Sequence, residues 1–217
     1  MIGAAPNPWI QTASGRAFDL LDPRPEAVDL TIDVPEALAR LPRFTGHIRS
    51  GPYSVAQHCV LGADALYAQT TRRDVALAFL LHDAHEAYLG DVATPIAAAL
   101  AQTCDQLRPS FAPGLIVRAA QRLLKQRIDT AIYAAVGAPY PLPDETARLV
   151  AIMDLRMLAA ERAQLLGRAP EPWAAAVEAA QPAQLKGAIK PWPWPKAADA
   201  WRARLALYAP KPIERAA

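Results

Sequence analysis

The segment FLLHDAHEAYL interrupts an apolar run with a histidine and an aspartate at adjacent positions, His82 and Asp83. If this segment is helical, neighbouring side chains are splayed around the helix axis, so the pair can hold a metal ion only at its edge. Other helices must then supply the remaining ligands. The segments YSVAQHC and VAIMDLR offer His58 and Asp154 for this purpose. The pattern therefore predicts a metal site assembled in the core of a helical bundle.

Each of these side chains has an ordinary explanation when it is taken alone. A single histidine in an apolar helix is more often a hydrogen-bonded core or surface residue than a ligand. An aspartate such as Asp154 is more often the partner in an internal ion pair. The combination is different because all these candidates lie in apolar helical segments, where buried charge is expensive. Metal coordination accounts for them together, and we favour it.

Further carboxylates accompany the predicted ligands. On a continuous helix, His82, His85 and Glu86 would share one face, because they are spaced i, i+3 and i+4. Asp91 follows just after the expected helix end at Gly90, where a turn can bring it back towards the same pocket. A metal ion lowers the pKa of a bound water, and a nearby carboxylate can take or donate the proton. These residues indicate general acid/base chemistry.

Size and composition narrow the class of protein. A chain of 217 residues suits one domain with a sizeable core. Its net charge of +2, with acids and bases mixed, does not favour binding of duplex nucleic acid. Cys59 and Cys104 make no C-x-x-C motif, which suits a reducing cytosol. The N-terminus resembles no signal peptide, and no long apolar run suggests a membrane span. We therefore expect a soluble cytoplasmic protein without a membrane partner.

Capping residues, glycines and prolines divide the chain into expected elements. The residues around Ser14 and Gly15 suit a short hairpin or an extended strap. After the last long helix, a short helix, the extended strap KPWPWP and a final helix are expected. We expect an all-α bundle in a single domain. The expected longer elements span residues 33–41, 55–67, 73–88, 94–100, 115–136 and 144–166.

These motifs resemble the HD-domain phosphohydrolase superfamily, whose signature is H…HD…D. The stretches VAQHCV, HDAHE and GDVATP look like those of bacterial 5′-deoxynucleotidases. In LPRFTGH, Arg43 and Phe44 stand where that family places an arginine followed by an aromatic residue. The N-terminal WIQTASGRAFDLLDP is similar to small bacterial and phage HD hydrolases, which include a phage deoxyadenosine-triphosphate triphosphohydrolase. The resemblance covers about residues 9–166 of a single HD domain, 1–217, and leaves 167–217 as a helical tail.

The resemblance implies a role for each matching residue. One divalent ion would be bound, and manganese, cobalt, iron, nickel, zinc and magnesium are all candidates. For the substrate-binding residues other roles stay open: an ion pair for the arginine, core packing for the phenylalanine, and loop ordering or orientation of Glu86 for the histidines. The metal ligands would be His58, His82, Asp83 and Asp154, the catalytic carboxylates Glu86 and Asp91, and the substrate-binding residues Arg43, Phe44, His47 and His85.

One departure concerns the phosphate contacts. Relatives often carry a lysine shortly after the T-P of this region, whereas this chain continues as TPIAAAL. Phosphate would then depend on Arg43, a histidine, or a base from QRLLKQR such as Lys125 or Arg127. A charged helix face of this kind is more often simply solvated.

The leading expectation is metal-dependent hydrolysis of a nucleotide, a deoxynucleoside 5′-monophosphate or triphosphate. An HD-type di-iron oxygenase would need additional histidines between the HD pair and the last aspartate, and the sequence has only His85 there. A non-enzymatic binding or regulatory module, in which the metal only stabilises the fold, would have a closed coordination shell with no position for water. The resemblance also implies a homodimer, and the tryptophan-rich tail is expected to pack on the core.

Overall fold

The N-terminal segment forms a hairpin rather than an extended strap. The computed structural model describes residues 7–210, and this part begins with two short antiparallel strands. Strand β1 (Trp9–Gln11) pairs with β2 (Ala17–Asp19), and Gly15 lies in the turn with a φ of 85°. A positive φ is a conformation that glycine adopts without steric cost. The hairpin therefore has the turn residue that its geometry requires.

Two contacts fix the hairpin to the helices. Phe18 is fully buried, and its ring stacks on that of Tyr88 with 3.7 Å between centroids. Ser14 donates its backbone N–H and its hydroxyl to the carboxylate of Asp33, at 2.6 and 2.8 Å. Asp33 is the first residue of α1 (Asp33–Arg40), and that helix has no side-chain cap although the sequence offers this aspartate at its start. Its carboxylate is instead occupied by the hairpin.

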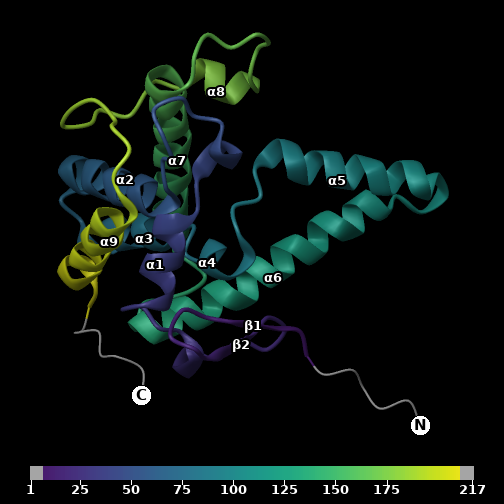
Figure 1. Ribbon diagram of the computed structural model, residues 1–217, viewed down its shortest axis with the longest axis horizontal. Helices are drawn as coiled ribbons and strands as arrows, with labels where there is room; N and C mark the ends of the chain where they lie inside the picture. Colours follow the sequence, from purple (N-terminus) through teal and green to yellow (C-terminus); the bar gives the residue numbers. More distant parts are fainter. Residues whose placement is uncertain (1–6, 211–217) are drawn as a thin grey trace.

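The core lies where α2, α3, α7 and α9 meet, with α1 against α9 (Figure 1). Gly62 of α2 allows the two central helices to approach, because a Cβ there would lie 2.0 Å from the Phe79 ring of α3. Trp201 of α9 is fully buried, and its indole N–H donates to the Leu80 carbonyl at 3.3 Å. The tail thus belongs to the core. The helices of this body are α2 (Val55–Thr70), α3 (Arg73–Leu81), α4 (Glu86–Leu89), α7 (Asp144–Leu165), α8 (Ala175–Ala179) and α9 (Trp194–Tyr208).

The helix that carries His58 begins where the sequence predicts. The Ser54 hydroxyl accepts a hydrogen bond from the Gln57 backbone N–H at 3.2 Å, which satisfies one of the free donors at the helix start. The Gln57 side chain holds the C-terminal strap, because it donates to the Lys190 carbonyl and accepts from the Trp192 backbone N–H, both at 2.8 Å.

The predicted single helix over residues 73–88 is wrong. Helix α3 ends at Leu81, and a tight turn leads to the short α4. The His82 ring nitrogen Nδ1 donates to the Phe79 carbonyl at 2.7 Å. In a continuing α-helix, that carbonyl would accept from the backbone N–H of Asp83 instead. The following hydrogen bonds span three residues, as in a 3₁₀ turn. His82, His85 and Glu86 consequently do not share the face of one regular helix.

Two long helices form an arm that projects from the body (Figure 1). Helix α5 (Thr94–Leu107) is longer than predicted, and α6 (Pro113–Val136) ends at Gly137 as predicted, with a φ of 74° at that glycine. The described part of the chain is mostly helical, so the all-α expectation is confirmed. None of its helices combines the length and the apolar character that a membrane crossing needs. The short 3₁₀ turns are η1 (Pro25–Ala27), η2 (Arg43–Gly46) and η3 (Pro109–Phe111).

Candidate metal centre

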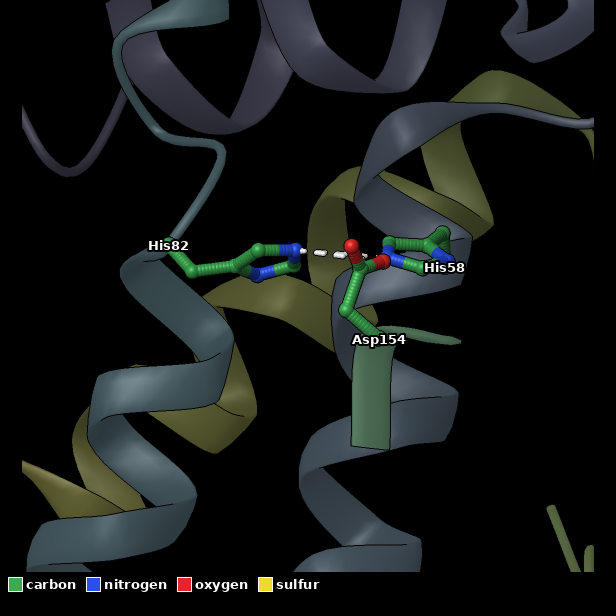
Figure 2. A group of neighbouring side chains, drawn as sticks. All are labelled: His58, His82 and Asp154. Atoms are coloured by element: carbon green, nitrogen blue, oxygen red, sulfur yellow. Dashed lines mark hydrogen bonds and ion pairs between the residues drawn. The ribbon is translucent and has the colours of Figure 1, made fainter. Parts of the chain in front are cut away.

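Three of the predicted ligands come together from three different helices. Figure 2 shows the His58 and His82 rings pointing towards each other, with the Asp154 carboxylate beside them. His58 lies in the first turns of α2, His82 follows the last residue of α3, and Asp154 lies in the middle of α7. The two Nε2 atoms are 3.4 Å apart, and Asp154 Oδ1 lies 3.3 Å from that of His58 and 3.7 Å from that of His82.

Asp83 joins the same cluster. Its Oδ2 lies 3.2 Å from His82 Nε2 and 3.9 Å from His58 Nε2. Ligand atoms about 2.1 Å from a metal ion in a tetrahedral shell are separated by roughly 3.4 Å. The printed separations in this cluster lie around that value, and two imidazoles with two carboxylates are ligands that divalent transition metals accept. The four predicted ligands therefore fit a metal ion.

The two histidines present the correct nitrogen to this centre. His58 Nδ1 lies 2.6 Å from Glu161 Oε1, and His82 Nδ1 lies 2.7 Å from the Phe79 carbonyl. Each partner is an acceptor, so each Nδ1 carries a ring hydrogen, and Nε2 is the nitrogen that faces the cluster. Metal-binding histidines are commonly oriented in this way by a carboxylate or carbonyl.

Glu161 is a functional residue that the sequence analysis missed. Its side chain is fully buried and accepts from the Tyr53 hydroxyl at 2.8 Å and from Arg43 Nε at 3.2 Å, in addition to His58. A weak signal was available, because Glu161 follows Asp154 by two helical turns and directly follows the apolar run MLAA of α7. It acts on the centre through the His58 ring and is a positioning residue.

Arg43 lies inside the site rather than in a surface ion pair. Its guanidinium is 13% exposed and bridges Glu161 and Asp83, with NH1 3.5 Å from Asp83 Oδ2. Phe44 is half-buried against the core, and its ring lies 6.4 Å from that of Trp173. His47 is exposed at the end of η2, where its backbone N–H donates to the Phe44 carbonyl. The structure thus brings Arg43 to the ligands, while His47 lies on the surface.

The two predicted catalytic carboxylates interact electrostatically with the ligands. Glu86 is 7% exposed, and burial together with the charges of Asp83 and Asp91 raises its pKa to about 9. Burial also raises the pKa of Asp91, with a smaller contribution in the same direction from Asp83. Lys125 of α6 acts on both side chains in the opposite direction. The other candidate base from that helix, Arg127, donates to the Leu21 carbonyl at 3.2 Å and belongs to the hairpin contact.

His85 has a partner that the sequence analysis did not foresee. Its Nδ1 lies 3.0 Å from Asp129 Oδ1 of α6. It is the residue before α4 and makes no side-chain cap there. Asp129 is therefore a further residue that positions a histidine beside the centre.

The ligand carboxylates are ionised in this environment. Burial acts to raise the pKa of Asp154, but hydrogen bonds and charge from His58 and His82 outweigh it and hold that pKa well below its ordinary value. The same balance, with Arg43 added, depresses the pKa of Asp83. Ionised carboxylates are the form in which these residues bind a cation, and an ion entering the site would displace the protons that the two histidines hold in its absence.

The cluster is buried on one side and open on the other. The His58 side chain has no exposed surface and that of Asp83 is 18% exposed, whereas the Asp154 side chain is 44% exposed. A structural metal site is enclosed by its ligands, and a catalytic one keeps a position for water or substrate. The arrangement can hold an ion that solvent and a small molecule can reach.

Comparison with known proteins identifies two bacterial relatives. The chain is 31% identical over 163 residues to the uncharacterized protein RCAP_rcc00048 of Rhodobacter capsulatus, covering 73% of this chain and 74% of that protein. It is 31% identical over 157 residues to the uncharacterized protein YfdR of Escherichia coli K12, covering 72% of each. No family model matches the chain.

Proposed function

The chain belongs to the family of these two bacterial proteins, and we propose that it is a metal-dependent phosphohydrolase of nucleotides. Its substrates would be deoxynucleoside 5′-monophosphates or triphosphates, as the resemblance to HD-domain phosphohydrolases implies. The observation that carries the proposal is the convergence of His58, His82, Asp83 and Asp154 around one point, open towards solvent at Asp154. A divalent ion bound there would activate water and offset phosphate charge.

The side chains around the ligands suit a phosphate ester. Arg43 of η2 and Lys125 of α6 supply positive charge that acts on Glu86 and Asp91. Arg43 is preorganised by Glu161, so its guanidinium needs no ordering when an anion arrives. Glu86 and Asp91 are the carboxylates that can accept the proton of the attacking water and return one to the leaving oxygen. Phe44 offers an aromatic surface to sugar or base.

The alternative of a metal staple without activity has less support. A staple needs a closed shell, but the Asp154 side chain is 44% exposed. It also gives no reason for Glu86 and Asp91 to lie near the ligand Asp83, whose charge adds to burial in raising the pKa of both side chains. Formation of a homodimer stays a prediction of the resemblance.

A product assay on the purified full chain tests the proposal. Deoxynucleoside mono- and triphosphates are incubated with Mn²⁺, Co²⁺, Ni²⁺, Zn²⁺ or Mg²⁺, and released deoxynucleoside is measured by chromatography, which detects loss of one phosphate or three. Asp91→Asn should lower the rate by roughly 10²- to 10⁴-fold while metal content is unchanged, because it removes proton transfer and not a ligand. The control is Asp144→Asn, an exposed aspartate at the start of α7, which should not change the rate.

Two results would contradict the proposal. One is the absence of deoxynucleoside release from every substrate with every metal. The other is a wild-type rate in Asp91→Asn, which would remove the assigned proton transfer.

A further inference from the structure

We propose that Asp83, His85 and Glu86 hold a second divalent cation next to the first, with Asp83 shared between the two ions. The inference rests on the proposed function for the first ion and changes the expected number of ions from one to two. It also assigns Glu86 to metal binding and leaves Asp91 as the proton-transferring carboxylate.

The three side chains lie close enough together for small shifts to bring them onto one ion. One ligand atom from each lies within 4.8 Å of the others. They come from the tight turn after α3 and the first residue of α4, so the break in the predicted helix is what brings them together. Asp83 has two carboxylate oxygens, and its Oδ2 is the atom that lies close to His82 and His58. A bridging carboxylate of this kind is suited to a two-metal site.

His85 has the orientation of a metal-binding histidine. Its Nδ1 is bonded to the Asp129 carboxylate at 3.0 Å, which places the ring hydrogen there and a lone pair on Nε2. His85 is only 5% exposed, and Nε2 has no hydrogen-bond partner. Burial of an unsatisfied acceptor costs about 1–3 kcal/mol, so native structures seldom retain one without a ligand or water.

Glu86 also has a buried polar atom without a hydrogen-bond partner. The residue is 7% exposed, and its Oε2 also lacks a partner. Two unsatisfied buried acceptors on adjacent residues, beside a third carboxylate, are accounted for together by one cation. A nitrogen ligand with two carboxylates suits Mn²⁺, Fe²⁺, Co²⁺ or Zn²⁺ better than Mg²⁺ or Ca²⁺, which prefer oxygen ligands throughout.

The charge around the site also favours two ions. Carboxylates outnumber cationic side chains here, and Arg43, which contacts Asp83, is already paired with Glu161. One divalent ion would leave the site with a net negative charge, which repels a phosphate ester, whereas two would balance the charge of the carboxylates. The carboxylates are Asp83, Glu86, Asp91, Asp129, Asp154 and Glu161, and the cations are Arg43 and Lys125.

Binding of Mn²⁺ to the chelator-treated full chain tests this proposal. Calorimetry and metal analysis should give two ions per wild-type chain, and electron paramagnetic resonance should show a spin-coupled pair. His85→Gln should bind one ion and lose the coupled signal, with Glu86→Gln as a second variant of the same site. His47→Gln is the matched control, since His47 is exposed on η2, and it should still bind two.

The outcomes separate the two proposals. One uncoupled Mn²⁺ per wild-type chain with deoxynucleotide hydrolysis intact would overturn the second site alone, and water would then satisfy His85 and Glu86. Two ions in both wild type and His85→Gln would place the second ion elsewhere and overturn the assignment. Binding of no Mn²⁺, together with no hydrolysis, would overturn the proposed function as well. The wild-type spectrum distinguishes one ion from a coupled pair even if a variant does not fold.

Discussion

At the scale of single residues, Glu161 connects the metal ligands to the interior of the protein. Its buried carboxylate accepts from His58, Tyr53 and Arg43. Glu161→Gln keeps the size of the side chain but removes the charge that orients His58 and pairs with Arg43. We expect metal affinity to fall by roughly 10- to 100-fold, as when other partners of metal-binding histidines are lost.

Calorimetric titration with Mn²⁺ measures this effect. The control is Glu171→Gln, an exposed glutamate in the segment before α8, for which affinity should not change. Unchanged Mn²⁺ affinity in Glu161→Gln would show that the glutamate has only a packing role.

The residues of the centre differ in how far the sequence could identify them. The proximity of His58, His82, Asp83 and Asp154 was predictable because ionisable side chains in apolar helical segments need a strong reason to lie there. Their binding of a metal ion stays a prediction. Glu161 and Asp129 were missed because each acts through a histidine from a distant segment, and one sequence does not show such pairs. His47 matches the expected pattern but is exposed.

At the scale of elements, the packing of α2 on α3 sets the position of two ligands. The Phe79 ring fills the space above Gly62, and its centroid lies 4.5 Å from that of His82 and 5.6 Å from that of His58. Gly62→Ala would place a methyl group into this ring. We expect a loss of about 1–3 kcal/mol in the free energy of unfolding, the usual cost of overpacking a core, and weaker Mn²⁺ binding.

Urea denaturation measures the change in stability. Gly167→Ala is the matched substitution, because no atom lies within 4 Å of the added Cβ, and its effect should stay within about 0.5 kcal/mol. Equal stability of Gly62→Ala and wild type would mean that the two helices can separate without cost.

Most elements followed from local signals, and the main error was the helix through the HD pair. Ser54 and Gly137 mark ends that their own chemistry fixes. The break after Leu81 depends on contacts from far away in the sequence, such as Phe18 on Tyr88 and Asp129 on His85. Residues 82–85 contain no glycine or proline that would have indicated this break in the helix.

At the scale of the whole molecule, the C-terminal tail completes the core. Helix α9 packs against α1, α2 and α3, and the fully buried Trp201 is its largest contribution. Trp201→Ala should therefore destabilise the protein by about 3–5 kcal/mol, through lost burial and the cavity left behind. Thermal unfolding checks this, with Leu207→Ala on the exposed side of the same helix as the control. Equal melting temperatures for Trp201→Ala and Leu207→Ala would contradict the tail's place in the core.

The position of the C-terminal tail could not be predicted from the motifs. The resemblance covers about residues 9–166 and carries the ligands, but α9 lies beyond it. The tryptophans of the tail predicted that it packs on the core, but they did not indicate which helices it contacts. Gln57 supplies a physical link, because the side chain next to His58 holds the strap that leads into α9.

The central claim is that a metal ion held by His58, His82, Asp83 and Asp154 makes this protein a nucleotide phosphohydrolase. The most direct test is the rate of deoxynucleoside release by chelator-treated protein as Mn²⁺ is added back, in wild type and in Asp154→Asn. We predict no release before addition, recovery in wild type with increasing Mn²⁺, and no recovery in Asp154→Asn. Release that is independent of metal, or a wild-type rate in Asp154→Asn, would contradict the account.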